Sequence, residues 1–511
     1  MRLLYKYREE FKLKEYPGPD IPRYAILSHT WGSDNEEVTF QDLLDGTGRD
    51  KPGFGKIEFC ATQSKRDGLQ YFWVDTCCID KSDNAELSKA INSMFRWYQN
   101  STRCYVYLSD VPMSGCEEYN QQREHILEAN FRASRWFTRG WTLQELLAPA
   151  SVEFFSEEGQ RLGDKRSLEK QIHRITGIAV PALQGSSLAH FSIKDRFEWA
   201  NTRETKREED WAYCLQGIFG VSMPVTYGEG KAQAIFRLKE EIRRNQQCLG
   251  DLRATDPRDD KQRIEQTKGG LLQDCYKWIL ENNDFQHWQN GQDQLLWVRG
   301  DPGKGKTMLL CGVINELEKP PATNITYFFC QATDTRINNA IAVLRGLVFL
   351  LIDQQPSLIR YIRDKYDQAG RPLFEDANAW FALSAIFKDI LQDPGLRTTY
   401  LVVDALDECI TGLDDLVRFI IQTSTTDFQV KWVVSSRNWP DIEKAFSKTQ
   451  NFGLSLELNG EFVSTAVATY IQFKMETLAK DNAFDFDMQD IIQSYLISNA
   501  GGTFLWVALV C

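Results

Sequence analysis

Apolar and polar positions in the first half of the chain alternate between short extended runs and stretches of helical spacing. The extended runs, which are typical of buried strands, lie at 24–28, 71–75 and 104–108. Between the second and third runs, apolar residues recur at helical spacing, namely Leu87, Ile91, Met94, Phe95 and Tyr98. Asp83, with Glu86 three residues later, resembles a capping box at the start of this helix. A strand, a helix and a strand in this order predict a right-handed crossover and parallel pairing. The first block is therefore predicted to be α/β.

A second series of apolar runs, separated by helical segments, occupies the later part of the chain. These runs lie at 295–298, 325–329, 399–404 and 430–437. Four apolar strands separated by helices predict a doubly wound parallel sheet. Ahead of them, 251–268 holds ten charged residues among eighteen, which predicts a solvated linker or an exposed helical arm, and an amphipathic helix follows at 271–280. We therefore expect a first domain at 1–244, a charged linker with an amphipathic helix at 245–290, and a second domain at 291–511.

The strongest motif is the octapeptide Gly300, Asp301, Pro302, Gly303, Lys304, Gly305, Lys306 and Thr307. It matches G-x-x-x-x-G-K-[ST], the phosphate-binding P-loop, and it lies between an apolar strand and a helical segment, as that motif requires. Its glycines let backbone N–H groups surround phosphates. Lys306 is expected to reach the β- and γ-phosphates, and the Thr307 hydroxyl to bind Mg²⁺.

A second acidic motif completes the expected metal site. Asp404 ends an apolar strand, where open α/β sheets bind ligands, and it is placed to hold Mg²⁺. Asp407 or Glu408 is placed to orient an attacking water as general base. Arg437 ends the next strand, where a cation can sense the γ-phosphate. P-loop residues contact phosphates and not the base, so ATP and GTP both remain open.

Composition narrows the class of protein. The net charge of −12 argues against binding nucleic acid. The twelve cysteines form no C-x-x-C pair, the five histidines show no metal-ligand spacing, and no apolar window is long enough to span a membrane. With no signal peptide at the start, we expect reduced thiols and a cytoplasmic protein.

Two family resemblances follow from these motifs. The P-loop, Asp404–Glu408 and Ser435–Arg437 together resemble a NACHT-type NTPase of the STAND class over about residues 260–511. Three long segments, 24–32, 72–80 and 136–147, resemble the signatures of the fungal heterokaryon-incompatibility (HET) domain, which is distantly similar to TIR domains. Such pairs are similar to fungal vegetative-incompatibility proteins of the NOD-like receptor kind. Those proteins continue with helical, winged-helix and repeat segments, so the NTPase domain ending at Cys511 is expected to be incomplete.

The resemblance implies a signalling switch. A slow nucleoside triphosphatase, with ATP or GTP and Mg²⁺, would control assembly into a homo-oligomer, and assembly would activate a HET effector that triggers cell death. The upstream protein ligand stays unidentified. Two alternatives remain open: a plain P-loop NTPase, and a HET block that consumes NAD under control of the NTPase.

Candidate chemistry within the HET-like block is less specific. Some TIR domains cleave NAD with a glutamate, which makes Glu145, on a predicted helix at 142–147, the candidate catalytic residue. A structural carboxylate is the competing interpretation. A nucleophile pair of Cys78 and His29 is also conceivable. The tryptophans at 31, 73, 136 and 141 are more typical of core than of a ligand site.

Overall fold

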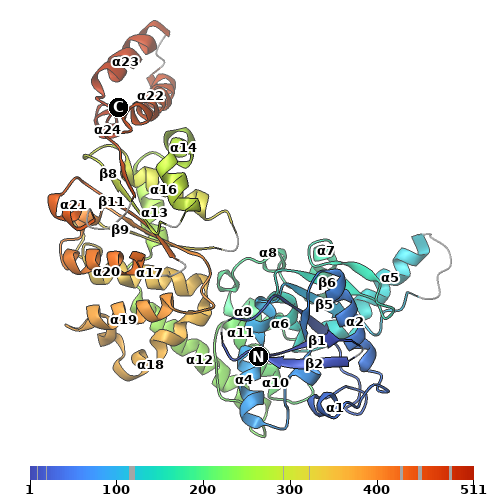
Figure 1. Cartoon of the computed structure of the whole chain (residues 1–511). Helices are drawn as coiled ribbons and strands as arrows, with labels where there is room; N and C mark the ends of the chain where they lie inside the picture. Colours follow the sequence, from blue (N-terminus) through green and yellow to red (C-terminus); the bar gives the residue numbers. More distant parts are fainter. Residues whose placement is uncertain are drawn as a thin grey trace. The chain divides into compact units, whose positions relative to one another are not determined.

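The computed structural model describes residues 1–8, 10–18, 20–113, 121–291, 293–320, 323–425, 430–446, 452–482 and 486–511. Contacts within the chain divide it into two compact units, Met1–Asn245 and Gln246–Cys511 (Figure 1). Each unit has its own hydrophobic core and its own sheet, so both are α/β.

The first unit is built on a seven-stranded mixed sheet with the order β2-β1-β4-β3-β5-β6-β7. Its strands are β1 (Arg2–Tyr7), β2 (Glu10–Glu15), β3 (Tyr24–His29), β4 (Tyr71–Trp73), β5 (Arg103–Tyr107), β6 (Val152–Phe155) and β7 (Arg161–Asp164). The middle strands β4, β3, β5 and β6 are parallel, and the outer pairs are antiparallel. The predicted parallel pairing is confirmed, with β3 lying between the two strands that the crossover joins. Every residue of β3 is buried, as expected for a central strand covered on both faces.

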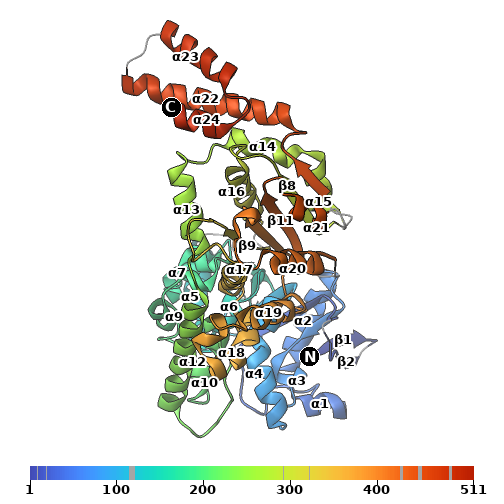
Figure 2. The same cartoon turned by 90° about the vertical axis from the view of Figure 1, so that its left-hand side faces the viewer.

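Helices surround this sheet (Figures 1 and 2). They are α1 (Phe40–Asp45), α2 (Phe54–Arg66), α3 (Asp75–Cys78), α4 (Asn84–Gln99), α5 (Gln121–Ala133), α6 (Thr142–Leu147), α7 (Glu169–Thr176), α8 (Val180–Leu183), α9 (Ile193–Glu198), α10 (Asp210–Tyr213) and α11 (Gln216–Phe219), with short 3-10 helices at Arg135–Thr138 and Leu188–His190. The predicted helices at 87–98 and 142–147 are confirmed as α4 and α6.

Two local predictions in this unit were wrong. The strand expected at 71–75 stops at Trp73, because Asp75 begins α3 and its carboxylate accepts hydrogen bonds from His29, at the end of β3, and from Trp31. At the start of α4, Asp83 caps the Ala85 and Glu86 amides as expected. The Glu86 carboxylate does not complete the capping box. It pairs with Arg2 and accepts a hydrogen bond from the Asp80 amide.

The second unit contains a five-stranded sheet, all parallel, with the order β12-β8-β11-β10-β9. Its strands are β8 (Leu295–Arg299), β9 (Asn324–Phe329), β10 (Thr399–Asp404), β11 (Val430–Ser436) and β12 (Phe452–Ser455). The four predicted strands are confirmed, and β12 is an additional edge strand. The chain leaves β8 toward the β9 edge and returns beyond β8 to form β12. The carboxyl end of β8 is therefore a switch point of the sheet, where α/β folds bind ligands.

Helices also cover both faces of this sheet (Figure 2). They are α13 (Pro257–Thr267), α14 (Gln273–Glu281), α15 (Asn283–Asn290), α16 (Lys306–Leu317), α17 (Ala340–Gln354), α18 (Arg360–Ala369), α19 (Ala379–Leu391), α20 (Leu413–Thr425), α21 (Pro440–Phe446), α22 (Gly460–Asn482), α23 (Phe486–Asn499) and α24 (Phe504–Val510), with 3-10 helices at Pro356–Ile359, Arg371–Phe374 and Leu406–Glu408.

The segment at 245–290, expected to be a charged linker or exposed arm with an amphipathic helix, is mostly helical, and the amphipathic helix expected at 271–280 is confirmed as α14. A long helix, α12 (Lys231–Leu252), continues through residue 245, and α13 to α15 follow almost without a break. Many of the charges are paired within the second unit. Arg258 binds Asp353 at 2.7 Å, and the largely buried Lys261 binds Asn315 at 2.6 Å. Helical phase places these residues against the core, which a count of charges cannot show.

No helix in the described part of the chain is long and apolar enough to cross a membrane.

Candidate functional site

The P-loop joins the carboxyl end of β8 to the first turn of α16. Gly303 and Gly305 have φ values of +82° and +83°, in the left-handed region that favours glycine. Lys306 and Thr307 are the first two residues of α16. The sequence thus folds locally as strand, glycine turn and helix, the arrangement that offers backbone N–H groups and a helix N-terminus to an anion.

Lys306 is folded back over this loop. Its Nζ donates to the carbonyl oxygens of Gly300 at 2.5 Å and Asp301 at 3.0 Å. Burial lowers the pKa of Lys306, and the nearby carboxylates of Asp407 and Asp404 oppose that shift. The ammonium group is therefore held at the phosphate-binding loop by neutral carbonyls that a phosphate can replace.

Asp404 lies at the carboxyl end of β10 and is almost fully buried. It accepts a hydrogen bond of 2.5 Å from the Ser435 hydroxyl on neighbouring β11. Burial raises the pKa of Asp404, while hydrogen bonds from Ser435 and Thr307 act in the opposite direction. The structure therefore brings together the two residues expected to bind Mg²⁺.

Asp407, Glu408 and Arg437 form a connected group beside Asp404. Asp407 accepts the backbone N–H of Arg437 at 2.9 Å and pairs with its Nε at 3.2 Å. Glu408 lies 3.5 Å from the Arg437 guanidinium and accepts the Ala332 amide at 3.0 Å. Arg437 is thus engaged by both acidic residues that are candidates for positioning water.

This donor set fits a magnesium-bound nucleoside triphosphate. A glycine turn, a lysine, a hydroxyl at the start of a helix and a buried carboxylate converge at one edge of the sheet. Oxygen ligands of this kind suit Mg²⁺, which keeps several waters and binds through one or two protein groups and the phosphates.

The predicted HET-like candidate Glu145 lies in α6 and is buried, with 6% of its surface exposed. Its carboxylate accepts a hydrogen bond from the Ser28 hydroxyl, and Ser28 in turn accepts the Trp136 indole N–H at 2.8 Å. Burial, with the nearby charge of Asp75, raises the pKa of Glu145 to about 8. A carboxyl group in this environment is protonated near neutral pH and is poised to exchange a proton.

A second carboxylate, Asp75, lies at the same edge of the sheet. It accepts hydrogen bonds from His29 Nε2 at 3.1 Å and Trp31 Nε1 at 3.0 Å. Burial alone would raise the pKa of Asp75, but Lys81, His29 and Arg139 together lower it to about 2. The unit therefore holds two carboxyl groups whose environments push their pKa values apart, an arrangement typical of acid–base sites.

The proposed pairing of Cys78 with His29 is wrong for this structure. His29 bonds to Asp75, and the Cys78 sulfur accepts the Val74 amide at 3.4 Å. Of the four tryptophans, Trp73 and Trp136 are fully buried, as core residues should be, whereas Trp31 and Trp141 are half-buried.

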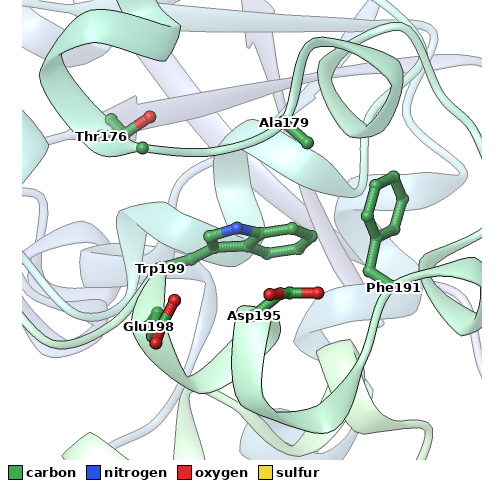
Figure 3. Close-up of a pocket in the computed structure, with 7 residues that line it drawn as sticks. Thr176, Ala179, Phe191, Asp195, Glu198 and Trp199 are labelled. Atoms are coloured by element: carbon green, nitrogen blue, oxygen red, sulfur yellow. The ribbon is translucent and has the colours of Figure 1, made fainter.

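A cavity of about 380 Å³ in the first unit lies apart from these groups. It is lined by residues of α7, the α7–α8 connection and α9, with Phe191, Trp199, Asp195 and Glu198 around it (Figure 3). Glu145 and Asp75 are not among its lining residues. Because Glu145 is buried, a small molecule that reacts with its carboxyl group would need a local opening of the structure.

Several site residues were not found from the sequence. Ser28 and Ser435 lie in segments that carry the family resemblances, but their hydrogen bonds to the buried carboxylates of Glu145 and Asp404 were not predicted. Arg203 is buried beneath α6, where it donates to the Thr142 hydroxyl and the Arg139 carbonyl, both at 2.8 Å. A single arginine outside the recognised motifs has no sequence pattern that predicts these hydrogen bonds to α6 and to the segment before it.

Comparison with known proteins agrees with both halves of this description. Residues 24–128 match the family described as Heterokaryon incompatibility protein (HET), and residues 274–437 match the family described as Nephrocystin 3, N-terminal. The chain is 57% identical over 502 residues to the vegetative incompatibility protein HET-E-1 of Podospora anserina. That alignment covers 98% of this chain and 37% of the relative's length. The chain thus contains one segment that matches the HET family and one that matches the nephrocystin-3 N-terminal family, and over nearly its whole length it is similar to a fungal vegetative incompatibility protein.

Proposed function

We propose that this chain is a nucleotide-regulated switch for heterokaryon incompatibility, in which the second unit binds a magnesium nucleoside triphosphate and controls the HET unit as effector. The observation that carries the proposal is the convergence of the P-loop, Thr307 and Asp404 at the switch point of a parallel sheet, in a chain whose other unit is a HET domain. In this proposal the protein acts in the cytoplasm. It hydrolyses the nucleotide slowly, because hydrolysis serves to reset the switch.

Within this proposal each site residue has a role. Lys306 leaves its carbonyl partners to bind the β- and γ-phosphates, and Thr307 with Asp404 holds Mg²⁺. Glu408 or Asp407 positions water, and Arg437, held between them, responds to the γ-phosphate. ATP and GTP are both accommodated, since none of these groups contacts the base.

Titration with a fluorescent analogue of ATP or GTP in the presence of Mg²⁺ tests the nucleotide site. Lys306→Ala should abolish binding, because it removes the point charge directed at the phosphates. Lys319→Ala, just beyond the C-terminal end of α16, where the exposed Lys319 pairs with Glu316, is the matched control and should bind as the wild type does. Equal affinity of all three proteins would refute the site.

The effector role is tested by clustering residues 1–244 in a fungal cell through an inducible oligomeriser and counting surviving cells. Clustering raises the effective concentration of the effector without any new contact, so weak self-association becomes productive. We expect cell death on induction. Unchanged survival of cells that contain the folded fusion would remove the effector role.

A second candidate function for the HET unit is enzymatic consumption of NAD under control of the NTPase. The environment of Glu145, buried beside Ser28 with a raised pKa and close to the ionised Asp75, favours it. Incubating the chain with NAD and following nicotinamide release is the direct test. Nicotinamide release by the wild type that is lost in Glu145→Gln would support an enzyme. If the clustered protein killed cells but released no nicotinamide, the HET unit would act as a scaffold and not as an enzyme.

A further inference from the structure

A short segment far along the chain, Gly501–Leu505, lies directly against the P-loop within the second unit. The Gly303 carbonyl accepts the backbone N–H of Phe504 at 2.9 Å, with Leu505 N–H at 3.4 Å. Lys304 Nζ donates to the carbonyl oxygens of Gly502 at 3.1 Å and Gly501 at 3.4 Å. The segment is therefore bound to the loop by both its backbone and a lysine side chain.

The two segments approach each other closely at the glycines of the P-loop. A Cβ atom placed on Gly303 would lie 2.8 Å from Leu505 Cβ, and one on Gly305 would lie 2.8 Å from the Phe504 ring. These contacts would force neighbours apart, so the two glycines serve the packing of this segment as well as the backbone turn.

The hydrogen bond to Gly303 fixes the orientation of a peptide group that a phosphate needs. In a planar trans peptide the C=O and the N–H point in opposite directions. Because the Gly303 carbonyl points to Phe504, the N–H of Lys304 in the same peptide points away from the docked segment. A loop N–H that points away from this segment stays available to a phosphate.

The segment is anchored to the same body as the loop. The Phe504 ring contacts Tyr470 of α22 at a centroid distance of 5.6 Å. Helix α22 packs on α14, where Phe462 stacks on Trp278 and Cys275 donates to the Ala466 carbonyl. Helix α14 in turn packs on α16, the helix that begins at the P-loop. Movement of α24 relative to α16 is therefore opposed by this helical support.

We propose that Gly501–Leu505 is a latch that holds the P-loop in its phosphate-binding conformation, so that nucleotide binding and docking of α24 stabilise each other. The inference rests on the proposed nucleotide site and names how that site is coupled to the helices α22–α24. Since coupling between two sites is reciprocal, nucleotide should protect the latch, and loss of the latch should weaken nucleotide binding.

The test uses two substitutions at one residue in the full chain. Phe504 is the first residue of α24, a position where helices tolerate proline, and the preceding Thr503 has an extended conformation compatible with it. Phe504→Pro removes the ring and the N–H donor, whereas Phe504→Ala removes only the ring. We expect Phe504→Pro to bind a fluorescent ATP analogue about two- to tenfold more weakly than Phe504→Ala, the effect of one hydrogen bond. Lys304→Met, which keeps the backbone N–H and removes the side-chain donor, should also weaken binding.

Hydrogen exchange gives the independent readout. In the wild type, Mg²⁺ with ATP should slow exchange of the Phe504 and Leu505 amides. If Phe504→Pro bound nucleotide as tightly as Phe504→Ala, and Lys304→Met as tightly as the wild type, the latch would be overturned while the nucleotide site stayed intact. Faster exchange on adding nucleotide would also overturn it, since the segment would then be released by binding. A wild type that binds no nucleotide would refute the proposed function together with the latch.

Discussion

At the scale of single residues, Glu145 makes a pH-dependent contribution to stability that can be measured without knowing any activity. Its pKa is raised from 4.5 to about 8 in the folded protein. Between these values the unfolded chain loses the proton while the folded protein keeps it. The free energy of unfolding therefore falls by about 1.4 kcal/mol for each unit by which the pH rises. Below the lower value the penalty disappears.

Glu145→Gln should therefore remove this pH dependence, because the amide stays neutral and its oxygen still accepts the Ser28 hydroxyl. We expect the melting temperature of the variant, relative to the wild type, to rise from pH 5 to pH 8 in scanning calorimetry of the full chain. Glu198→Gln, at an exposed carboxylate, is the control and should show no such trend. A constant difference between Glu145→Gln and wild type across this range would contradict the buried, protonated state.

Asp404 and Glu408 are predicted to differ in function. Asp404→Asn should weaken Mg²⁺-dependent nucleotide binding, because it removes the buried carboxylate that pairs with Ser435. Glu408→Gln should leave affinity intact and slow hydrolysis, because the half-buried Glu408 is expected to position the attacking water and not to hold the metal. Nucleotide titration and single-turnover hydrolysis check the two effects. If both variants lost affinity equally, the division of roles would be wrong.

At the scale of elements, helix packing supplies a stability prediction with a matched control. Gly312 in α16 faces the Tyr276 ring, and a Cβ there would lie 2.2 Å from it. Gly250 in α12 has open space at the same position. Gly312→Ala should destabilise the second unit by about 1–3 kcal/mol through overpacking, whereas Gly250→Ala should be neutral or stabilising by up to about 1 kcal/mol. Urea unfolding of both variants is the measurement, and equal effects would contradict the close α14–α16 packing.

Elements with a strong apolar run were predictable, and short or exposed ones were not. The strand at 399–404 is apolar except at its ends and coincides with β10. In the hairpin of β1 and β2, Phe11 and Leu13 alternate with charged residues, a short strand pattern that the prediction missed. β12 is only four residues long, too short for a pattern to stand out. The amphipathic helix expected at 271–280 is α14, whereas α13 was expected to be a solvated linker or an exposed arm because charge density was counted without the helical phase that buries Lys261.

The same distinction holds for the candidate site. The P-loop and Asp404 are local motifs, so their residues follow from the sequence. Their partners come from distant parts of the chain: Ser435 is separated from Asp404 by 31 residues, and Gly502 from Lys304 by 198. Such contacts depend on strand order and helix docking, which no local pattern encodes.

At the scale of the whole molecule, the account joins a HET effector to a nucleotide-binding unit in one chain that spans 37% of the length of its curated relative. If nucleotide state controls assembly, the nucleotide must bind the assembled form and the separate chain with different affinities, since a ligand shifts an equilibrium only by its differential affinity. That requirement makes the central claim measurable on the purified chain, without a cellular readout.

The direct measurement is the mass of the full chain in solution with Mg²⁺ and either ADP or a non-hydrolysable ATP analogue, by light scattering after size exclusion. The account predicts larger assemblies with the triphosphate than with ADP, and no response in Lys306→Ala. A wild-type chain that binds both nucleotides and has the same mass with each would contradict the switch.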